Sequence, residues 1–187
     1  IKIGKYKVSR IFERYLGAKH PKHEIIKLKK NKKNWISEEI IERVNYHLNQ
    51  NDQVLFFVNR RGFAPYVLCK KCLKVHNCPN CSINLVYHKI KKKLICHYCG
   101  LTKSIERNCS NNSKCEYTFS GPGVEKIFEE AKTMFPDKKI TILSSDTMKK
   151  KNSSNILNDI KKNNLQILVG TQLISKGFHF PNLNCIV

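Results

Sequence analysis

Cysteine spacing constrains this chain more than any other feature of its sequence. Eight of the nine cysteines form four close pairs: Cys69 and Cys72, Cys78 and Cys81, Cys96 and Cys99, and Cys109 and Cys115. A Cys-x-x-Cys knuckle brings two thiolates to one metal ion from a tight turn, and a second knuckle completes a tetrahedron with Zn–S distances of about 2.3 Å. The eight cysteines therefore have the ligand count of two four-cysteine zinc sites.

We predict a nested pairing of these knuckles. The segment between Cys81 and Cys96 has two apolar stretches around a turn, as in a zinc ribbon, so the middle two pairs would form an inner site. The first and last pairs would close an outer site around it. Sequential pairing is less favourable because only five residues separate Cys72 from Cys78. Five residues also separate Cys109 from Cys115, so the outer site is expected to be loosely held or empty.

Other uses of paired cysteines fit the pattern less well. A catalytic zinc has three protein ligands and an open position, whereas four pairs leave no gap in the ligand set. Disulfides are rare in a reducing compartment, and a thioredoxin-like redox pair would not come fourfold. His76, His88 and His97 could each replace a cysteine ligand, but we expect solvated histidines at these positions.

Charge adds a second, weaker indication. Lys and Arg number 35 against 14 Asp and Glu, a formal net charge of +21, which favours a polyanionic partner such as nucleic acid. Abundant Lys and Asn also arise from an AT-biased genome, so charge alone does not decide.

No apolar run approaches the roughly 20 residues that span a bilayer, and no leader opens the sequence, so a cytoplasmic protein without a membrane partner is expected. The start at Ile1 and the end within an apolar run suggest a piece of a longer protein.

Hydrophobic periodicity predicts an α/β fold with a parallel sheet. Apolar runs indicate strands at residues 54–58, 140–143, 167–169 and 183–187, and the spacing of three and four indicates helices that begin after Ser37 and after Gly123, with a third over 155–160. Residues 1–35 are interpreted as a connecting segment with short strand-like stretches at 6–12 and 24–28. The expected domains are a lobe that starts over 36–68, a zinc-binding insertion over 69–117 and a continuation of the lobe over 118–187.

Several strings together resemble one family of helicases. They are Asn59-Arg60-Arg61-Gly62-Phe63, the cysteine pairs, Gly121-Pro122-Gly123-Val124-Glu125, and the twelve residues from Gly170 to Pro181. This combination resembles the PriA family, also called primosomal replication protein N-prime. Members of that family are superfamily-two 3′-to-5′ DNA helicases that restart stalled replication forks. The resemblance implies an incomplete RecA-like second helicase lobe with an inserted double four-cysteine zinc-binding module.

The resemblance also implies roles for single residues. Gly170-Thr171-Gln172 matches helicase motif V, so Thr171 and Gln172 would face single-stranded DNA, and Lys176 and Gly177 would lie near the nucleotide. Arg60 and Arg61 would contact backbone phosphates or else form a solvated turn. The family usually has His at the position of Phe178 and Cys at that of Asn112, and the second difference weakens the outer zinc site.

Two helicase motifs do not occur in this sequence. There is no Gly-x4-Gly-Lys-Ser/Thr loop and no Asp-Glu-x-His box, so ATP and magnesium would be bound only by the complete helicase, and this chain is not expected to hydrolyse ATP alone. Implied partners are forked or single-stranded DNA, other primosome proteins and single-strand-binding protein, in replication restart, recombination and repair. The alternatives are a stand-alone zinc-dependent nucleic-acid-binding protein without a motor and a non-functional remnant of a split gene.

Overall fold

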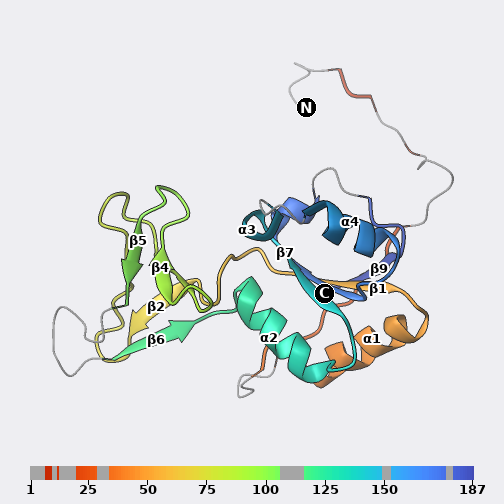
Figure 1. The fold of residues 1–187 in the computed structure, drawn as a ribbon, viewed down its shortest axis with the longest axis horizontal. Helices are drawn as coiled ribbons and strands as arrows, with labels where there is room; N and C mark the ends of the chain where they lie inside the picture. The colour runs from red at the N-terminus through yellow and green to blue at the C-terminus, as the bar shows by residue number, and fades with distance from the viewer. Residues whose placement is uncertain are drawn as a thin grey trace.

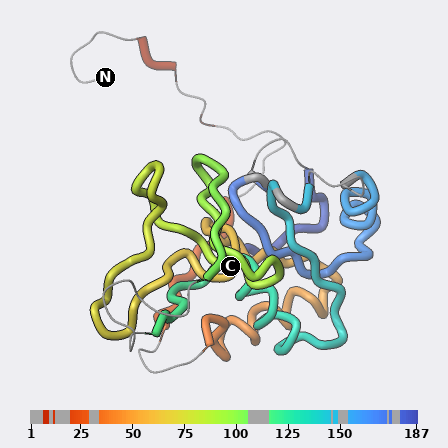
Figure 2. The backbone as a smooth tube through the Cα atoms, turned by 60° about the vertical axis from the view of Figure 1, so that its left-hand side comes forward, coloured from red at the N-terminus to blue at the C-terminus, as the bar shows by residue number. Residues whose placement is uncertain are grey.

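The chain folds into two connected parts. The computed structural model describes residues 7–9, 12, 20–28, 34–105, 116–148, 153–175 and 179–187. The described residues within 34–58 and 121–187 form a sheet flanked by helices, here called the sheet lobe, and those within 59–120 form the cysteine module beside it (Figure 1). Turned by 60°, the yellow and green cysteine module still lies to one side of the blue strands (Figure 2).

The sheet lobe is built on four parallel strands. Their order is β7, β8, β1, β9, with bounds Ile140–Leu143, Ile167–Gly170, Gln53–Phe57 and Leu183–Ile186. Val54 pairs with Ile167 and Phe57 with Gly170, so β1 and β8 run in step and end at the same edge. Loops that follow these two strands therefore start side by side.

Both faces of this sheet are buried, because alternate side chains of each strand point to opposite layers. Val54, Phe56, Ile167 and Val169 pack with helices α1 (Glu38–Asn49) and α2 (Val124–Met134). Leu55 and Leu168 pack on the other face with Ile160 of α4 (Ser153–Lys161). Figure 1 shows α1 and α2 below the sheet and α4 above it. This two-sided burial explains the unbroken apolar runs of the sequence.

One side-chain cap and one buried amide fix the ends of helices α1 and α4. The Ser37 hydroxyl accepts from the N–H of Ile40 at the start of α1 (3.4 Å). The fully buried Gln53 donates through Nε2 to the carbonyls of Ile160 and Leu165, 2.8 and 2.9 Å away. Gln53 thereby ties the end of α4 and the approach to β8 onto β1.

The cysteine module contains two small antiparallel sheets. Strands β2 (Tyr66–Cys69) and β6 (Tyr117–Ser120) form a two-stranded ribbon, and β3 (Val86–His88), β4 (Lys93–Ile95) and β5 (Thr102–Ser104) form a three-stranded sheet. Among the residues described, the module's main buried cluster consists of Val67, Cys78, Leu85, Leu94 and Cys96, and Ala64 and Cys69 are also buried. The predicted boundaries at 68/69 and 117/118 fall within the β2–β6 ribbon.

Most predicted elements are confirmed, and the exceptions are short. The four parallel strands and the helices after Ser37, after Gly123 and over 155–160 are all present. The strand-like stretch at 24–28 of the predicted connecting segment forms no strand, and the stretch at 6–12 lies largely outside the described residues. The short helix α3 (Ser145–Met148) and the 3₁₀ turn η2 (Gln172–Ser175) were not predicted. Across the described ranges, no helix has both the length and the apolar character needed to cross a membrane.

Candidate metal centre and nucleic-acid interface

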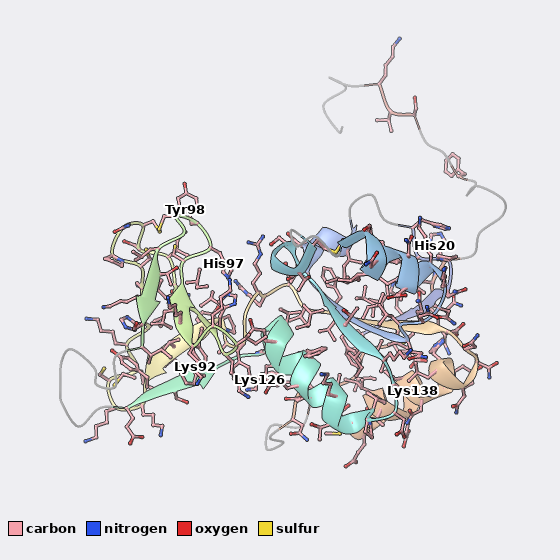
Figure 3. The ribbon with its side chains drawn as sticks, in the orientation of Figure 1. His20, Lys92, His97, Tyr98, Lys126 and Lys138 are labelled. Carbon is pink, nitrogen blue, oxygen red and sulfur yellow. The ribbon has the colours of Figure 1, made fainter. Side chains whose placement is uncertain are left out.

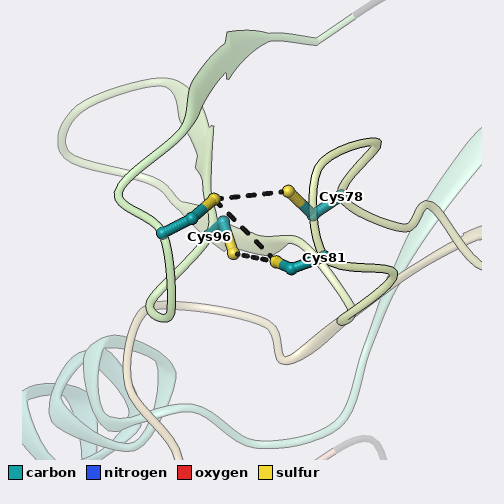
Figure 4. Close-up of side chains that lie close together, drawn as sticks. Cys78, Cys81 and Cys96 are labelled. Atoms are coloured by element: carbon teal, nitrogen blue, oxygen red, sulfur yellow. Dashed lines mark hydrogen bonds between the residues drawn. The ribbon is translucent and has the colours of Figure 1, made fainter.

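Four cysteines from two knuckles converge on one point in the cysteine module. The Sγ atoms of Cys78, Cys81, Cys96 and Cys99 all lie within 4.8 Å of one another. Sγ–Sγ distances are 3.4 Å for Cys81 and Cys96, 3.6 Å for Cys78 and Cys99, and 3.8 Å for Cys81 and Cys99 (Figure 4). A regular tetrahedron around zinc has Sγ–Sγ edges of about 3.8 Å at the usual Zn–S distance. The donor set fits a structural zinc ion, and the predicted inner pairing is confirmed.

The first cysteine of each knuckle sits in the same backbone turn. The N–H of Ser82 donates to the carbonyl of Cys78, and the N–H of Gly100 donates to that of Cys96 (2.9 and 3.0 Å). Ser82 and Gly100 both have positive φ, 56° and 78°. The turn thus needs a residue in the left-handed region four positions after the first cysteine, where glycine is the least strained choice.

The Cys69 and Cys72 pair adopts this turn as well. The N–H of Leu73 donates to the carbonyl of Cys69 (2.9 Å), and Leu73 has a φ of 55°. Cys69 is buried and Cys72 is exposed. The other half of the predicted outer site, Cys109 and Cys115, lies outside the described residues, so the outer site stays a prediction.

Two thiols of the inner cluster, those of Cys81 and Cys96, have pKa values shifted in opposite directions. The backbone N–H of Cys99 lowers the pKa of Cys96 to about 6, because it stabilises the thiolate. Burial and the hydrogen bond with Cys96 raise the pKa of Cys81 to about 12. Zinc binds thiolates, so metal binding must displace protons from this cluster.

The expectation of solvated histidines is wrong for His88. Its side chain is 3% exposed, and its Nδ1 lies 2.9 Å from Oε1 of Glu125 in α2. Its Nε2 lies 2.8 Å from Nε2 of His97. His76 stacks on Tyr117 with ring centroids 5.2 Å apart. Nothing in the sequence indicates these contacts, because each partner lies on a different element.

Candidate nucleic-acid residues gather at the carboxyl edge of the sheet. Arg60 and Arg61 follow β1 and are exposed, and Thr171 and Gln172 follow the neighbouring strand β8. Thr171 is 6% exposed and donates its N–H to the carbonyl of Leu143 (3.2 Å), whereas Gln172 is exposed. Guanidinium groups and amides at such an edge are suited to phosphate contacts. Lys176 and Gly177 lie outside the described residues.

An apolar pocket of about 400 Å³ adjoins the same edge. Its lining includes Trp35, Phe57, Arg60, Tyr66 and Val187. The N–H of Trp35 donates to Oε2 of Glu130 in α2 (2.8 Å), which holds the segment before α1 against the lobe. Sequence reasoning assigned no role to Trp35, whose partners are far away along the chain.

Comparisons with known proteins identify both parts. The family model described as "PriA DNA helicase Cys-rich region (CRR) domain" matches residues 78–103, and "Helicase conserved C-terminal domain" matches residues 95–187. The replication restart protein PriA of Rickettsia felis is 41% identical over 191 residues, which cover 100% of this chain and 30% of that protein.

Two more distant relatives agree. The replication restart protein PriA of Haemophilus influenzae is 37% identical over 185 residues, covering 98% of this chain and 25% of the relative. That of Bacillus subtilis is 29% identical over 160 residues, covering 85% and 20%. The chain thus spans less than a third of the length of these relatives. A zinc-ribbon cysteine cluster lies beside the parallel sheet of a helicase C-terminal domain, and the alignments with PriA proteins at 37–41% identity cover all or nearly all of this chain. The chain therefore belongs to the PriA family.

Proposed function

We propose that this chain supplies the zinc module and part of the second lobe of a primosomal ATP-dependent 3′-to-5′ DNA helicase that acts in replication restart, recombination and repair. The observation that carries the proposal is similarity to replication restart proteins along the whole chain, with both the inner zinc ligands and the parallel sheet in place. Its work on DNA would take place in the cytoplasm. The boundaries 36–68, 69–117 and 118–187 belong to the same proposal.

Within that helicase the carboxyl edge of the sheet would bind DNA. Arg60 and Arg61 would contact backbone phosphates beside Thr171 and Gln172, since the two loops leave neighbouring strands that end together. Lys176 and Gly177 would lie near ATP and its magnesium ion, which the complete helicase would bind and hydrolyse. The cysteine module would contact the DNA fork, other primosome proteins and single-strand-binding protein.

The module would hold two zinc ions in this proposal. Support for the second is the turn at Cys69, which repeats the geometry of the two inner knuckles down to the positive φ of Leu73. Cys109 and Cys115 would provide the remaining ligands. Zinc measured per denatured chain with a colorimetric chelator tests this directly: two ions support the outer site, and one ion excludes it.

DNA binding is tested with forked DNA and a matched pair of double variants. Arg60→Ala with Arg61→Ala removes the two cations at the carboxyl edge. Lys138→Ala with Lys139→Ala removes two exposed cations just before β7, at the amino edge (Figure 3 labels Lys138). The arginine variant should make the negative slope of log affinity against log salt shallower by about 2, at roughly 0.9 per lost phosphate contact. Equal effects of the two variants would contradict the proposed interface.

The motor role is tested by complementation. Separately expressed segments of a relative that carry the missing ATP-binding motifs should restore ATP-dependent fork unwinding when mixed with this chain. Fork binding without restored unwinding would favour a stand-alone nucleic-acid-binding protein. Failure of the chain to accumulate as folded protein would favour a non-functional remnant.

A further inference from the structure

Three polar side chains connect the inner cysteine cluster to helix α2. Glu125 is in the first turn of α2, His88 is the last residue of β3, and His97 lies between the ligands Cys96 and Cys99. The Glu125–His88 contact is 2.9 Å and the His88–His97 contact is 2.8 Å. Figure 3 shows His97 on the side of the cysteine module that faces the sheet lobe, with Tyr98 at the far tip.

The hydrogen-bond roles in this connection follow from the carboxylate. A carboxylate only accepts, so Nδ1–H of His88 donates to Oε1 of Glu125. For two neutral rings, Nε2 of His88 then accepts from Nε2–H of His97. The second oxygen of Glu125 accepts the backbone N–H of Lys89 at 3.0 Å. Both carboxylate oxygens are thus used on the end of β3, and Glu125 itself is 13% exposed.

A close backbone contact lies beside these side chains. The N–H of Glu125 donates to the carbonyl of Gly62 (2.9 Å), and the N–H of Phe63 donates to that of Tyr87 (2.8 Å), so the loop of residues 59–63 lies between α2 and β3. A Cβ on Gly62 would come within 2.6 Å of Cγ1 of Val86 and 3.2 Å of Nε2 of His88. The loop that carries Arg60 and Arg61 is therefore held by β3 and α2, the two elements that the His88–Glu125 contact joins.

We propose that Glu125, His88 and His97 form a positioning relay between the inner zinc site and the sheet lobe. Zinc fixes the knuckle of residues 96–99, and with it His97; His97 orients His88, and His88 holds Glu125. Zinc binding thereby tightens the first turn of α2 and the loop of residues 59–63. The inference goes beyond the proposed function, and it requires zinc at the inner site but neither DNA nor ATP.

An ion pair one turn along α2 provides an internal control. Nζ of Lys89 lies 2.7 Å from Oε2 of Glu129, so this pair also joins the end of β3 to α2. Its side chains are 50% and 45% exposed, against 3% and 13% for His88 and Glu125. Exposed pairs contribute little, because solvent screens them. If proximity alone coupled the two parts, both contacts would matter equally.

Hydrogen exchange of the 187-residue chain, zinc-loaded or stripped by a chelator, tests the relay. In the unsubstituted chain, stripping zinc should speed amide exchange over residues 123–127 about tenfold, within the range of couplings between contacting residues. Glu125→Ala and His97→Ala should exchange quickly there even with zinc bound. His97→Gln, whose amide N–H can reach His88, should retain protection, and Glu129→Ala should match the unsubstituted chain.

Two results would overturn the relay. One is protection over residues 123–127 that does not change when zinc is stripped. The other is the same protection in Glu125→Ala as in Glu129→Ala, or in His97→Ala as in the unsubstituted chain. If Glu125→Ala does not fold, zinc release from His97→Ala to a chelator decides: release several-fold faster than from His97→Gln supports the relay, and equal release refutes it. Fork binding is not part of this test, so loss of the proposed function would leave its result intact.

Discussion

The sheet lobe and the cysteine module reach stability by different means. Every described strand of the lobe pairs with a parallel neighbour, and the sheet buries large aliphatic side chains on both faces. The module has strands of three or four residues, and two of the five buried residues in its main hydrophobic cluster are cysteines. Apolar burial suffices for the first part, whereas a sheet as small as the second needs a metal ion. From this difference we expect a substitution to change the stability of only the part in which it lies, except at the contact between the sheet lobe and the cysteine module.

The largest effect is expected from Cys96→Ser, which removes a ligand from the inner cluster. Structural zinc contributes on the order of 10–16 kcal/mol in small zinc-binding peptides, so the three-stranded sheet of β3, β4 and β5 should lose its fold while the parallel sheet persists. Zinc per chain, and hydrogen exchange over residues 78–105 compared with β1 and β8, measure this. Cys185→Ser in β9 is the control and should keep all bound zinc. A Cys96→Ser chain that retained both zinc and exchange protection would refute the comparison.

Next comes Leu168→Ala, in the layer under α4. Leu168 is fully buried, and a cavity there should lower the free energy of unfolding of the lobe by about 2–5 kcal/mol. Leu94→Ala in β4, equally buried, is the matched substitution in the cysteine module, where we expect faster zinc release and little change in the lobe. Urea denaturation and chelator competition separate the two outcomes. Loss of zinc retention in Leu168→Ala as large as in Leu94→Ala would show that the parts are not distinct.

The two parts also differ in how much their sequences reveal. The strands at residues 54–58 and 167–169 were predictable, because side chains buried on both faces leave unbroken apolar runs. The edge strand at 140–143 was predictable from a shorter, mostly apolar run. The inner zinc ligands were predictable because their spacing is short and local. Burial of His88 was not, since Glu125 lies 37 positions away and nothing in the sequence marks the pair. Nor were β2 and β6, whose pairing joins residues from opposite ends of the module.

The contact between the parts is broken most directly by Gly123→Ala. A Cβ at this position would lie 2.2 Å from the carbonyl oxygen of Gly62, a backbone atom that moves only with its loop. Overpacking of this kind costs about 1–3 kcal/mol, and exchange protection should fall both in the first turn of α2 and in β3. Thr133→Ala, exposed near the end of α2, is the control. A loss confined to one side would mean that the contact does not transmit strain.

The smallest effect is expected from Ser37→Ala, at the start of α1. The hydroxyl accepts the N–H of Ile40 at 3.4 Å, a long bond, so its loss should cost about 0.5–1 kcal/mol of lobe stability, at the lower end for N-caps. Zinc release should not change, because the cap lies at the start of α1 in the sheet lobe, whereas the inner zinc ligands lie in the cysteine module. Ser104→Ala, exposed in β5, is the matched serine of the module and should leave lobe stability within about 0.5 kcal/mol. Urea denaturation and chelator-driven zinc release, measured on both variants, decide the matter: faster zinc release in Ser37→Ala would mean that even a peripheral cap of the lobe supports the metal site, and that the two parts unfold as one unit.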